Sequence, residues 1–247
     1  MGYDIVSFDL DGTLVDTAAE IAEAANRALE SHGMARRSPA EITLLIGNGT
    51  RELMLELLAR ALLDQPALAN TVRAEAVLES LDRHYADTTG TSAVAYDGAR
   101  EALTQLKAAG VKLACVTNKE IRHADRVLQA TQLGNFFELT IGGDSLPQKK
   151  PHASVLRYVV DTLGGDRHRT AHVGDSAVDI AAARNAGVAA WVVPYGYNAG
   201  LPIADAHPQR IFPGLLQVAE HVLASRRSEA GTVARISQSL HTPREFP

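Results

Sequence analysis

The second half of the chain constrains the fold most, because short apolar segments alternate there with helical ones. Strands are expected at residues 111–116, 137–141, 170–173 and 188–193, and helices at 99–109, 120–133, 153–163 and 177–186. Strands separated by single helices are typical of βαβ units around a parallel sheet. We therefore expect an α/β protein with a Rossmann-like parallel sheet core.

The first strand of this sheet is expected at residues 5–8, where a short apolar run ends abruptly in acidic and small residues. From residue 16 to 95 the pattern is only helical, as where Ile21, Ala25 and Leu29 recur at four-residue spacing. This stretch predicts an α-helical cap inserted after the first strand. The expected units are a core domain of residues 1–15 and 96–224, a cap domain of residues 16–95 and a flexible tail of residues 225–247.

Composition and charge exclude several classes of protein. Lys and Arg number 24 against 29 Asp and Glu, which gives a net charge of -5. This charge balance lacks the excess of basic residues that proteins use to bind duplex nucleic acid. No apolar run approaches the ~20 residues that span a bilayer. Cys115 is the one cysteine, so a disulfide framework and a multi-cysteine metal site are both excluded. We expect a soluble, cytoplasmic protein without nucleic-acid or membrane partners, as a monomer or a homodimer.

The polar residues that follow the expected strands predict where the chemistry lies. In an open parallel sheet, ligands bind beyond the carboxyl ends of the strands. The residues expected at that edge are Asp9 and Asp11 after the first strand, Thr117 and Asn118 after the second, Lys150 beyond the third, and Asp175, Ser176 and Asp179 after the fourth. One edge of the sheet would thus collect carboxylates, a hydroxyl, an amide and an ammonium group.

Carboxylates gathered at one point repel each other unless a cation lies between them. A site of carboxylate and carbonyl oxygens, completed by phosphate and water, suits Mg²⁺. The Thr117 hydroxyl, the Asn118 amide and the Lys150 ammonium supply donors for phosphoryl oxygens. The residues therefore predict a metal-assisted phosphoryl site with an acidic nucleophile.

The same residues carry a resemblance to a known family. In order and spacing, over residues 1 to about 220, the chain resembles the haloacid dehalogenase superfamily in its phosphatase form. The matching motifs are Asp9-Leu10-Asp11-Gly12-Thr13-Leu14-Val15-Asp16-Thr17, Val116-Thr117-Asn118-Lys119, Lys150-Pro151, and Gly174-Asp175-Ser176 with Asp179. More narrowly, it is similar to bacterial phosphoglycolate phosphatases at Ile46-Gly47-Asn48-Gly49, Gly142-Gly143-Asp144, Lys150-Pro151-His152 and Tyr195-Gly196-Tyr197-Asn198.

The resemblance implies a role for each acidic residue. Asp9 would attack phosphorus and form an aspartyl-phosphate, while Lys150 and Mg²⁺ hold the phosphoryl oxygens. Asp11 would protonate the departing alkoxide and then deprotonate the attacking water. Asp9 and Asp175 would bind the metal through their side chains, and Asp11 through its backbone carbonyl. A haloalkanoate dehalogenase needs no such acid, so an aspartate at position 11 favours phosphate chemistry.

Plainer interpretations remain open for the other residues. Thr117 and Asn118 could cap a helix as well as bind phosphate. Ser176 could be only a helix cap. Asp179 could be a charge on a helix face, or it could orient Lys150 or a metal-bound water from outside the metal's ligand shell.

The cap contributes candidates of its own. Gly47, Asn48 and Gly49 could form an interhelical turn, or they could place their amides above the substrate if the cap folds over the sheet edge. Arg51 could meet a substrate carboxylate, although a surface position is the plainer interpretation.

The function predicted from these observations is that of a Mg²⁺-dependent phosphatase for a small phosphorylated metabolite, with 2-phosphoglycolate, converted to glycolate and phosphate, as the first choice. A phosphosugar mutase of the same superfamily is an alternative. A phospho-aspartate switch of the receiver type and a non-catalytic binding protein with the same scaffold are further alternatives.

Overall fold

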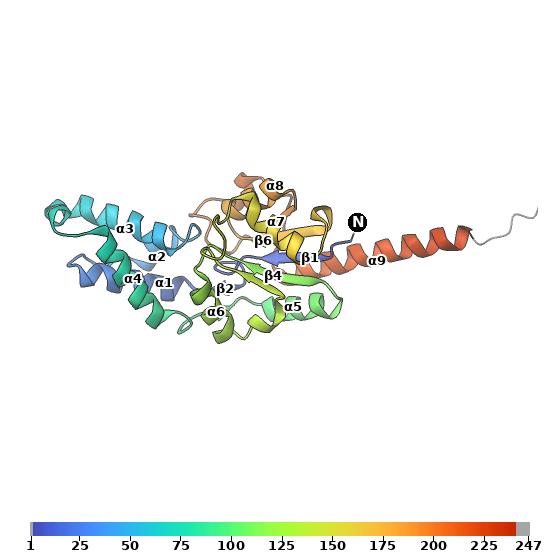
Figure 1. Cartoon of the computed structure of the whole chain (residues 1–247), viewed down its shortest axis with the longest axis horizontal. Helices are drawn as coiled ribbons and strands as arrows, with labels where there is room; N and C mark the ends of the chain where they lie inside the picture. Colours follow the sequence, from blue (N-terminus) through green and yellow to red (C-terminus); the bar gives the residue numbers. More distant parts are fainter. Residues whose placement is uncertain (1, 241–247) are drawn as a thin grey trace, which may run out of the picture.

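The computed structural model describes the backbone of residues 2–240 and the side chains of residues 2–229. Figure 1 shows a central sheet with helices on both sides, a group of helices set apart at one end, and a long C-terminal helix leaving the body at the other end. The expected α/β class, with a Rossmann-like sheet and a helical cap, is confirmed.

The main sheet has six strands in the order β5-β4-β1-β6-β7-β8, and all neighbouring strands are parallel. Their bounds are β1 (Ile5–Phe8), β4 (Lys112–Val116), β5 (Leu139–Ile141), β6 (Thr170–Gly174), β7 (Ala189–Val192) and β8 (Arg210–Ile211). Strand β8 was not predicted, because two residues are too short for an alternating pattern. The central position of β1, between β4 and β6, decides where the site forms.

Helices cover both faces of the sheet because the strands are apolar on both sides. On one face Val6 and Phe8 pack in a core with α5 (Ala99–Ala108), α6 (Ile121–Ala130) and α9 (Leu215–Leu240). On the other face Ile5 packs with α7 (Ala153–Thr162) and α8 (Ala177–Ala186). Cys115 is buried in the first of these cores.

The cap consists of α1 (Ala18–Ser31), α2 (Pro39–Thr43), α3 (Thr50–Asp64) and α4 (Ala74–Thr88). It has a core of its own, in which Leu29, Met54, Leu57 and Tyr85 are almost completely buried. Short 3-10 segments lie in the connections at Pro66–Asn70, Gly134–Phe136, Arg167–Arg169 and Ile203–Ala206. The cap therefore has a core separate from those on the two faces of the sheet.

A two-stranded antiparallel ladder marks the place where the chain enters and leaves the cap. Strand β2 (Val15–Asp16) pairs with β3 (Val94–Ala95), with Val15 opposite Ala95 and Asp16 opposite Val94. The sequence pattern did not predict this ladder, since each strand has only two residues. It holds both connections side by side beneath the cap; the exact extents of the two domains stay a prediction.

Helix α9 continues to Leu240, through the first part of the segment where a flexible tail was expected. Two ion pairs hold its middle against the core: Arg226 Nη1 lies 3.4 Å from Asp4 Oδ1, and Glu229 Oε1 lies 2.6 Å from Arg169 Nη1. These long-range contacts have no local sequence signal. The rest of the expected tail, residues 241–247, lies outside the described residues.

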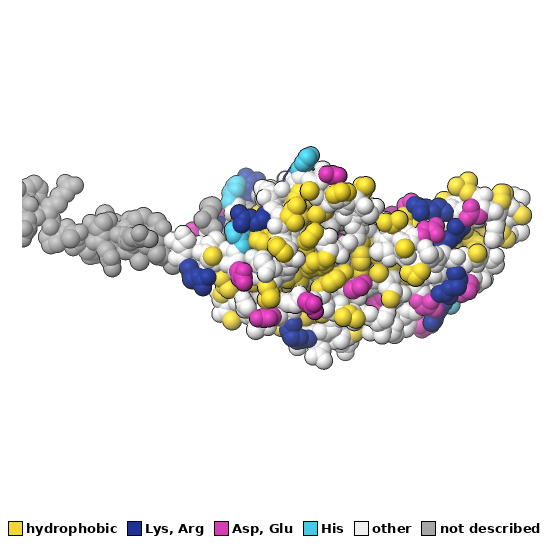
Figure 2. Space-filling view, turned by 180° about the vertical axis from the view of Figure 1, so that it is seen from behind, with side chains coloured by type: hydrophobic (Ala, Val, Ile, Leu, Met, Phe, Trp, Pro, Cys, Tyr) yellow, Lys and Arg dark blue, Asp and Glu magenta, His cyan; other side chains and the backbone are white. Residues whose placement is uncertain are grey.

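The surface carries charges of both signs. In the view of Figure 2, Lys and Arg side chains are interspersed with Asp and Glu side chains, and apolar side chains gather over the middle of that face. Within residues 2–240, no helix combines the length and the apolar composition that crossing a bilayer requires.

Candidate active site

The carboxyl ends of three strands bring the predicted residues together. Asp9 follows β1, Thr117 follows β4 and Asp175 follows β6. Because β1 pairs with β4 on one side and with β6 on the other, the three residues meet at one edge of the sheet. Lys150 reaches the same point from the loop before α7, and its Nζ lies 2.9 Å from Asp9 Oδ1.

Asp9 has one engaged and one free carboxylate oxygen. Its Oδ1 accepts a hydrogen bond of 2.8 Å from the backbone N–H of Leu10 and pairs with Lys150. Its Oδ2 has no partner among the described residues. Burial raises the pKa of Asp9 to about 7, against the opposing effect of the Lys150 ammonium. The free oxygen can attack an electrophile or bind a cation.

Asp175 is fixed by one hydrogen bond to each oxygen. Thr13 Oγ1 donates to its Oδ1 at 2.7 Å, and the backbone N–H of Tyr197 donates to its Oδ2 at 2.6 Å. A Cβ at Gly12 or Gly196 would lie 2.4 or 2.2 Å from Asp175 Oδ2, so only glycine lets both loops approach this closely. Burial, with neighbouring carboxylates, raises the pKa of Asp175 well above its usual range.

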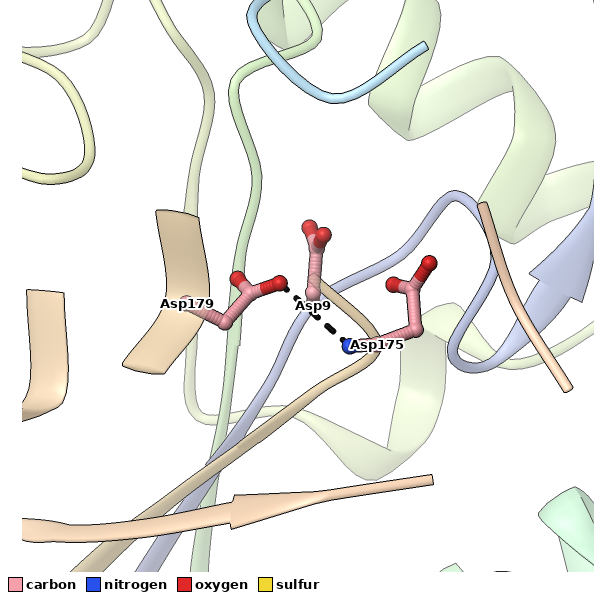
Figure 3. Close-up of side chains that lie close together, drawn as sticks. All are labelled: Asp9, Asp175 and Asp179. Carbon is pink, nitrogen blue, oxygen red and sulfur yellow. Dashed lines mark hydrogen bonds between the residues drawn. The ribbon is translucent and has the colours of Figure 1, made fainter. Parts of the chain in front are cut away.

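Figure 3 shows the side chains of Asp9 and Asp175 side by side, with the Asp179 side chain directed toward Asp9 from a neighbouring helix. Carboxylate oxygens of the three lie within 4.8 Å of each other. Such a group of buried carboxylates is unfavourable without a cation, and it offers the oxygen ligands that Mg²⁺ prefers.

Asp179 differs from the other two because its oxygens are already engaged. Its Oδ1 accepts from Lys150 Nζ at 2.7 Å and lies 3.2 Å from His172 Nε2. Its Oδ2 accepts from the backbone N–H and the hydroxyl of Ser176, at 3.1 and 2.6 Å, and from the N–H of Asp175 at 3.3 Å (the dashed line in Figure 3). These bonds cap α8 and orient Lys150, and they leave Asp179 fewer free lone pairs for a cation than Asp9 and Asp175 have.

Charges explain the protonation states of this buried pair. Burial acts against the charged form of Asp179, yet Lys150 and His172 hold its pKa below the usual range. Burial likewise opposes the charge on Lys150, and the carboxylates of Asp179 and Asp9 raise its pKa above the usual range. Lys150 therefore stays an ammonium group beside Asp9.

A metal ion fits the donors that are left. Asp9 Oδ2 is unpartnered among the described residues and Asp175 accepts only one bond at each oxygen, which leaves lone pairs on both carboxylates. With the backbone carbonyl of Asp11 implied by the family resemblance, these residues would form an all-oxygen set. The set is hard in character and contains no His or Cys ligand, which suits Mg²⁺.

Asp11 faces the cap side of the site. Its Oδ1 accepts from Thr17 Oγ1 at 2.6 Å and from Lys119 Nζ at 2.7 Å. Lys119 was not singled out from the sequence, although it directly follows Thr117 and Asn118; no spacing rule distinguishes it from a surface lysine. Its side chain is 1% exposed, and its Nζ lies 5.1 Å from the centre of the Tyr85 ring on α4.

Asn118 ties the cap to the core. Both hydrogens of its amide are used, because Nδ2 donates to the carbonyl of Gly47 at 3.1 Å and to that of Lys150 at 3.0 Å. Its backbone N–H has no acceptor among the described residues. A phosphate contact at this position would therefore use the backbone N–H of Asn118 together with the hydroxyl of Thr117.

The loop at residues 47–49 lies over the sheet edge, as the cap interpretation required. Gly47 and Gly49 line the same pocket as Asp9 and Asp11. Asn48 is bound through its carbonyl, which accepts from Lys149 Nζ at 2.7 Å. The backbone at Gly49 has φ of 101°, and a Cβ there would lie 3.1 Å from the Asn118 carbonyl.

A pocket lies between the cap and the sheet edge. Its lining residues are Asp9, Asp11, Ile21, Ile46, Gly47, Gly49, Thr50, Leu53, Thr117, Asn118 and Lys119. Arg51 is exposed and lines a separate cavity with Glu120 and His123. Arg51 does not line the pocket that contains Asp9 and Asp11.

Comparisons with known proteins agree with this geometry. The family described as haloacid dehalogenase-like hydrolase matches residues 6–193. A phosphoglycolate phosphatase of Vibrio vulnificus is 36% identical over 221 residues, which are 90% of this chain and 96% of that protein. A plasmid-encoded phosphoglycolate phosphatase of Cupriavidus necator is 41% identical over 192 residues, or 78% of this chain and 81% of that protein.

The solved structures give the same result. The crystal structure of a predicted phosphoglycolate phosphatase from Haemophilus somnus superposes with a TM-score of 0.81 at 32% identity, and the match covers 88% of this chain and 97% of that one. With the acidic residues at the ends of β1 and β6 and the cap inserted after β1, the chain belongs to the haloacid dehalogenase-like hydrolase family.

Proposed function

We propose that the protein is a Mg²⁺-dependent phosphatase that hydrolyses 2-phosphoglycolate to glycolate and phosphate through an aspartyl-phosphate. The observation that carries the proposal is that Asp9 and Asp11 line one pocket beneath the cap, while Lys150 Nζ lies 2.9 Å from Asp9 Oδ1. Its similarity to proteins named phosphoglycolate phosphatase supports the choice of substrate.

In the first step, Asp9 Oδ2 forms a bond to phosphorus while the bond from phosphorus to the ester oxygen breaks. The departing oxygen takes a proton from Asp11, whose Oδ2 has no partner among the described residues and can hold that proton. An alkoxide is a poor leaving group, so a general acid contributes about 10²–10⁴-fold. The products of this step are glycolate and the phosphorylated Asp9.

In the second step, a water molecule attacks phosphorus and transfers a proton to Asp11. The bond between Asp9 and phosphorus breaks, which releases phosphate, restores the Asp9 carboxylate and leaves Asp11 protonated for the next cycle. A bound Mg²⁺ would neutralise charge on the phosphoryl oxygens in both steps. Lys150 is well placed to do the same from the protein side, because its ammonium lies 2.9 Å from Asp9.

The cap supports a small substrate. The cap contributes the apolar side chains of Ile21, Ile46 and Leu53 to the lining of the pocket. An apolar cap surface over the sheet edge limits the size of the leaving group and reduces the access of bulk water to the phosphorylated Asp9.

The test is a panel of phosphomonoesters assayed with Mg²⁺, including 2-phosphoglycolate, sugar phosphates, nucleotides and pyrophosphate. We expect 2-phosphoglycolate to give the highest kcat/KM. Activity should disappear after treatment with EDTA and return with Mg²⁺, because the carboxylates need a cation to accept an anionic substrate. A sugar phosphate that is turned over much faster than 2-phosphoglycolate would contradict the proposed substrate.

A further inference from the structure

Lys119 is the cation of the pocket. It lines the pocket with Asp11, whose Oδ1 lies 2.7 Å from its Nζ, while the facing wall consists of Ile21, Ile46 and Leu53. The Lys119 side chain is 1% exposed, so its charge is removed from bulk water. A buried ammonium beside an apolar wall interacts strongly with any anion that enters.

The other cations near the site are already engaged elsewhere. Lys150 lies between Asp9 and Asp179. Lys149 pairs with Glu52 at 2.7 Å and donates to the carbonyl of Asn48. Arg51 lines the separate cavity. Among the described residues, Lys119 is thus the positive charge on the side of the pocket where the leaving group lies.

The position of Asp11 defines that side. In the proposed function, Asp11 transfers a proton to the ester oxygen and must lie within hydrogen-bond distance of it. In 2-phosphoglycolate a single methylene separates this oxygen from the carboxylate, which places the carboxylate within about 4 Å of the ester oxygen. Lys119 Nζ, at 2.7 Å from Asp11 Oδ1, lies within reach of a carboxylate so placed.

Lys119 has donors to spare. Of its three N–H groups, Asp11 accepts one and the Tyr85 hydroxyl is a second polar neighbour, which leaves at least one N–H for a ligand. Asp11 keeps the bond from Thr17 Oγ1 at 2.6 Å if Lys119 turns toward a ligand. The ammonium can therefore hold Asp11 and a second anion at once.

We infer that Lys119 is a specificity-determining residue that binds the carboxylate of the substrate, and that the pocket selects phosphate esters of 2-hydroxy acids. This inference rests on the proposed function, in which Asp11 faces the ester oxygen. It assigns the carboxylate to Lys119 in place of Arg51. The same geometry would also let Lys119 act only through Asp11, as a positioning residue, and the experiment separates the two roles.

The experiment compares two substrates in Lys119→Met and the unaltered protein. One is 2-phosphoglycolate, and the other is 2-hydroxyethyl phosphate, which has a neutral hydroxymethyl group in place of the carboxylate. We expect kcat/KM for 2-phosphoglycolate to fall by about 10²-fold, since a charge-assisted bond in a buried site is lost. For 2-hydroxyethyl phosphate the fall should be less than about 5-fold.

The ratio of the two kcat/KM values, measured on one preparation, does not depend on the folded fraction. Lys119→Arg should keep much of the preference for the carboxylate, because the charge remains. Lys149→Met is the matched control: it removes a lysine that also contacts the cap but does not line the pocket, and it should change both substrates alike.

Binding supplies a readout that is independent of turnover. In an Asp9→Asn background, calorimetry with 2-phosphoglycolate should show weaker binding when Lys119→Met is added, whereas binding of inorganic phosphate should not change. An equal loss for both substrates would mean that Lys119 only positions Asp11, and it would overturn the inference while leaving the proposed function intact. If another carboxylated ester is the best substrate and loses its advantage in Lys119→Met, the inference stands and 2-phosphoglycolate is the wrong substrate.

Discussion

The two buried lysines of the active site are held in different ways. Lys150 lies 2.9 Å from Asp9 and 2.7 Å from Asp179, and both carboxylates belong to the α/β core. Lys119 lies 2.7 Å from Asp11, and its other neighbour is the ring of Tyr85 on the cap. The half of the site that would bind the phosphoryl group is therefore complete within the core, while the half that would bind the leaving group is closed by the cap.

The difference shows how one scaffold can keep its chemistry and vary its substrate. The core half has its geometry fixed by strand ends and by the capping of α8, which do not depend on the cap. The cap half changes whenever the cap moves or its lining residues change. Substitutions in the core half should therefore affect all substrates, and substitutions in the cap half should affect some substrates more than others.

The largest effect is expected for Asp9→Asn, in the core half. Because the amide cannot attack phosphorus, kcat should fall by at least about 10⁴-fold for every substrate, the order seen when a covalent nucleophile is removed. The change is nearly isosteric, burial already disfavours the charged form of Asp9, and Lys150 keeps its ion pair with Asp179, so the thermal midpoint should move little. Steady-state kinetics and thermal unfolding of the same sample check both expectations; turnover near that of the unaltered protein would exclude Asp9 as the nucleophile.

The next effect is expected for Asp179→Asn, which removes a charge that touches no substrate. Lys150 loses its closer carboxylate and the 175–176 loop loses a charged acceptor. Breaking a buried ion pair costs about 3–5 kcal/mol, and we expect about 3 kcal/mol in urea unfolding because Asp9 still pairs with Lys150. Asp161→Asn, at an exposed position of α7, is the control and should be neutral. A stable Asp179→Asn protein would mean that Asp9 alone satisfies Lys150.

The sequence predicted which residues of the core half lie close together, whereas it predicted the cap half only in outline. Asp9, Thr117 and Asp175 each follow an apolar strand, and the parallel arrangement of these strands fixes where their ends meet. Such residues are predictable because a local pattern and a general topology rule determine their positions.

The residues that the sequence did not single out are those placed by contacts across the chain. Lys119 acquires its role only because α4 brings Tyr85 over it, and nothing near residue 119 encodes that approach. The engagement of both amide hydrogens of Asn118 likewise depends on the cap loop at Gly47. Arg51 carried the right charge for a carboxylate, but the turn of α3 directs it to another cavity.

A smaller effect is expected for Tyr197→Phe, which tests how the core holds the base of the cap. The Tyr197 hydroxyl donates to Asp16 Oδ1 at 2.5 Å and accepts from the backbone N–H groups of Thr17 and Ala18, at 3.0 and 3.2 Å. Loss of these bonds should lower the free energy of unfolding by about 2 kcal/mol. Because they anchor the start of α1, kcat/KM for 2-phosphoglycolate should fall while inhibition by inorganic phosphate stays the same.

Tyr158→Phe is the matched control for this change, since the Tyr158 side chain is exposed on α7. It should alter neither stability nor kinetics. If Tyr197→Phe weakened inhibition by phosphate as much as it lowered kcat/KM, the two halves of the site would be coupled through this tyrosine, and the comparison drawn above would fail.

The smallest effect is a pH dependence at the interface between cap and core. His123, on α6, packs its ring 4.4 Å from that of Tyr85 and lies 3.1 Å from Thr89 Oγ1. Burial, together with the nearby charges of Arg122 and Lys119, lowers the pKa of His123 to about 4. The unfolded chain has its ordinary value near 6.5 and so binds more protons than the folded chain between these two pH values.

Stability from a neutral His123 is therefore complete above about pH 6.5 and is lost progressively as the pH falls toward 4. Over this pH interval, we expect the free energy of unfolding of the unaltered protein to fall by about 1 kcal/mol relative to that of His123→Gln. This is less than the full pKa difference would give, because water can reach the protonated ring at the edge of the cap. Urea unfolding at a series of pH values measures the difference in the free energy of unfolding between the two proteins. The contributions of other titrating groups cancel in this difference, because both proteins contain them. His168→Gln, at an exposed position, should give a curve parallel to that of the unaltered protein. If His123→Gln gave a parallel curve as well, the ring would be as accessible to protons in the folded chain as in the unfolded one, and the contact between α4 and α6 would be open in solution.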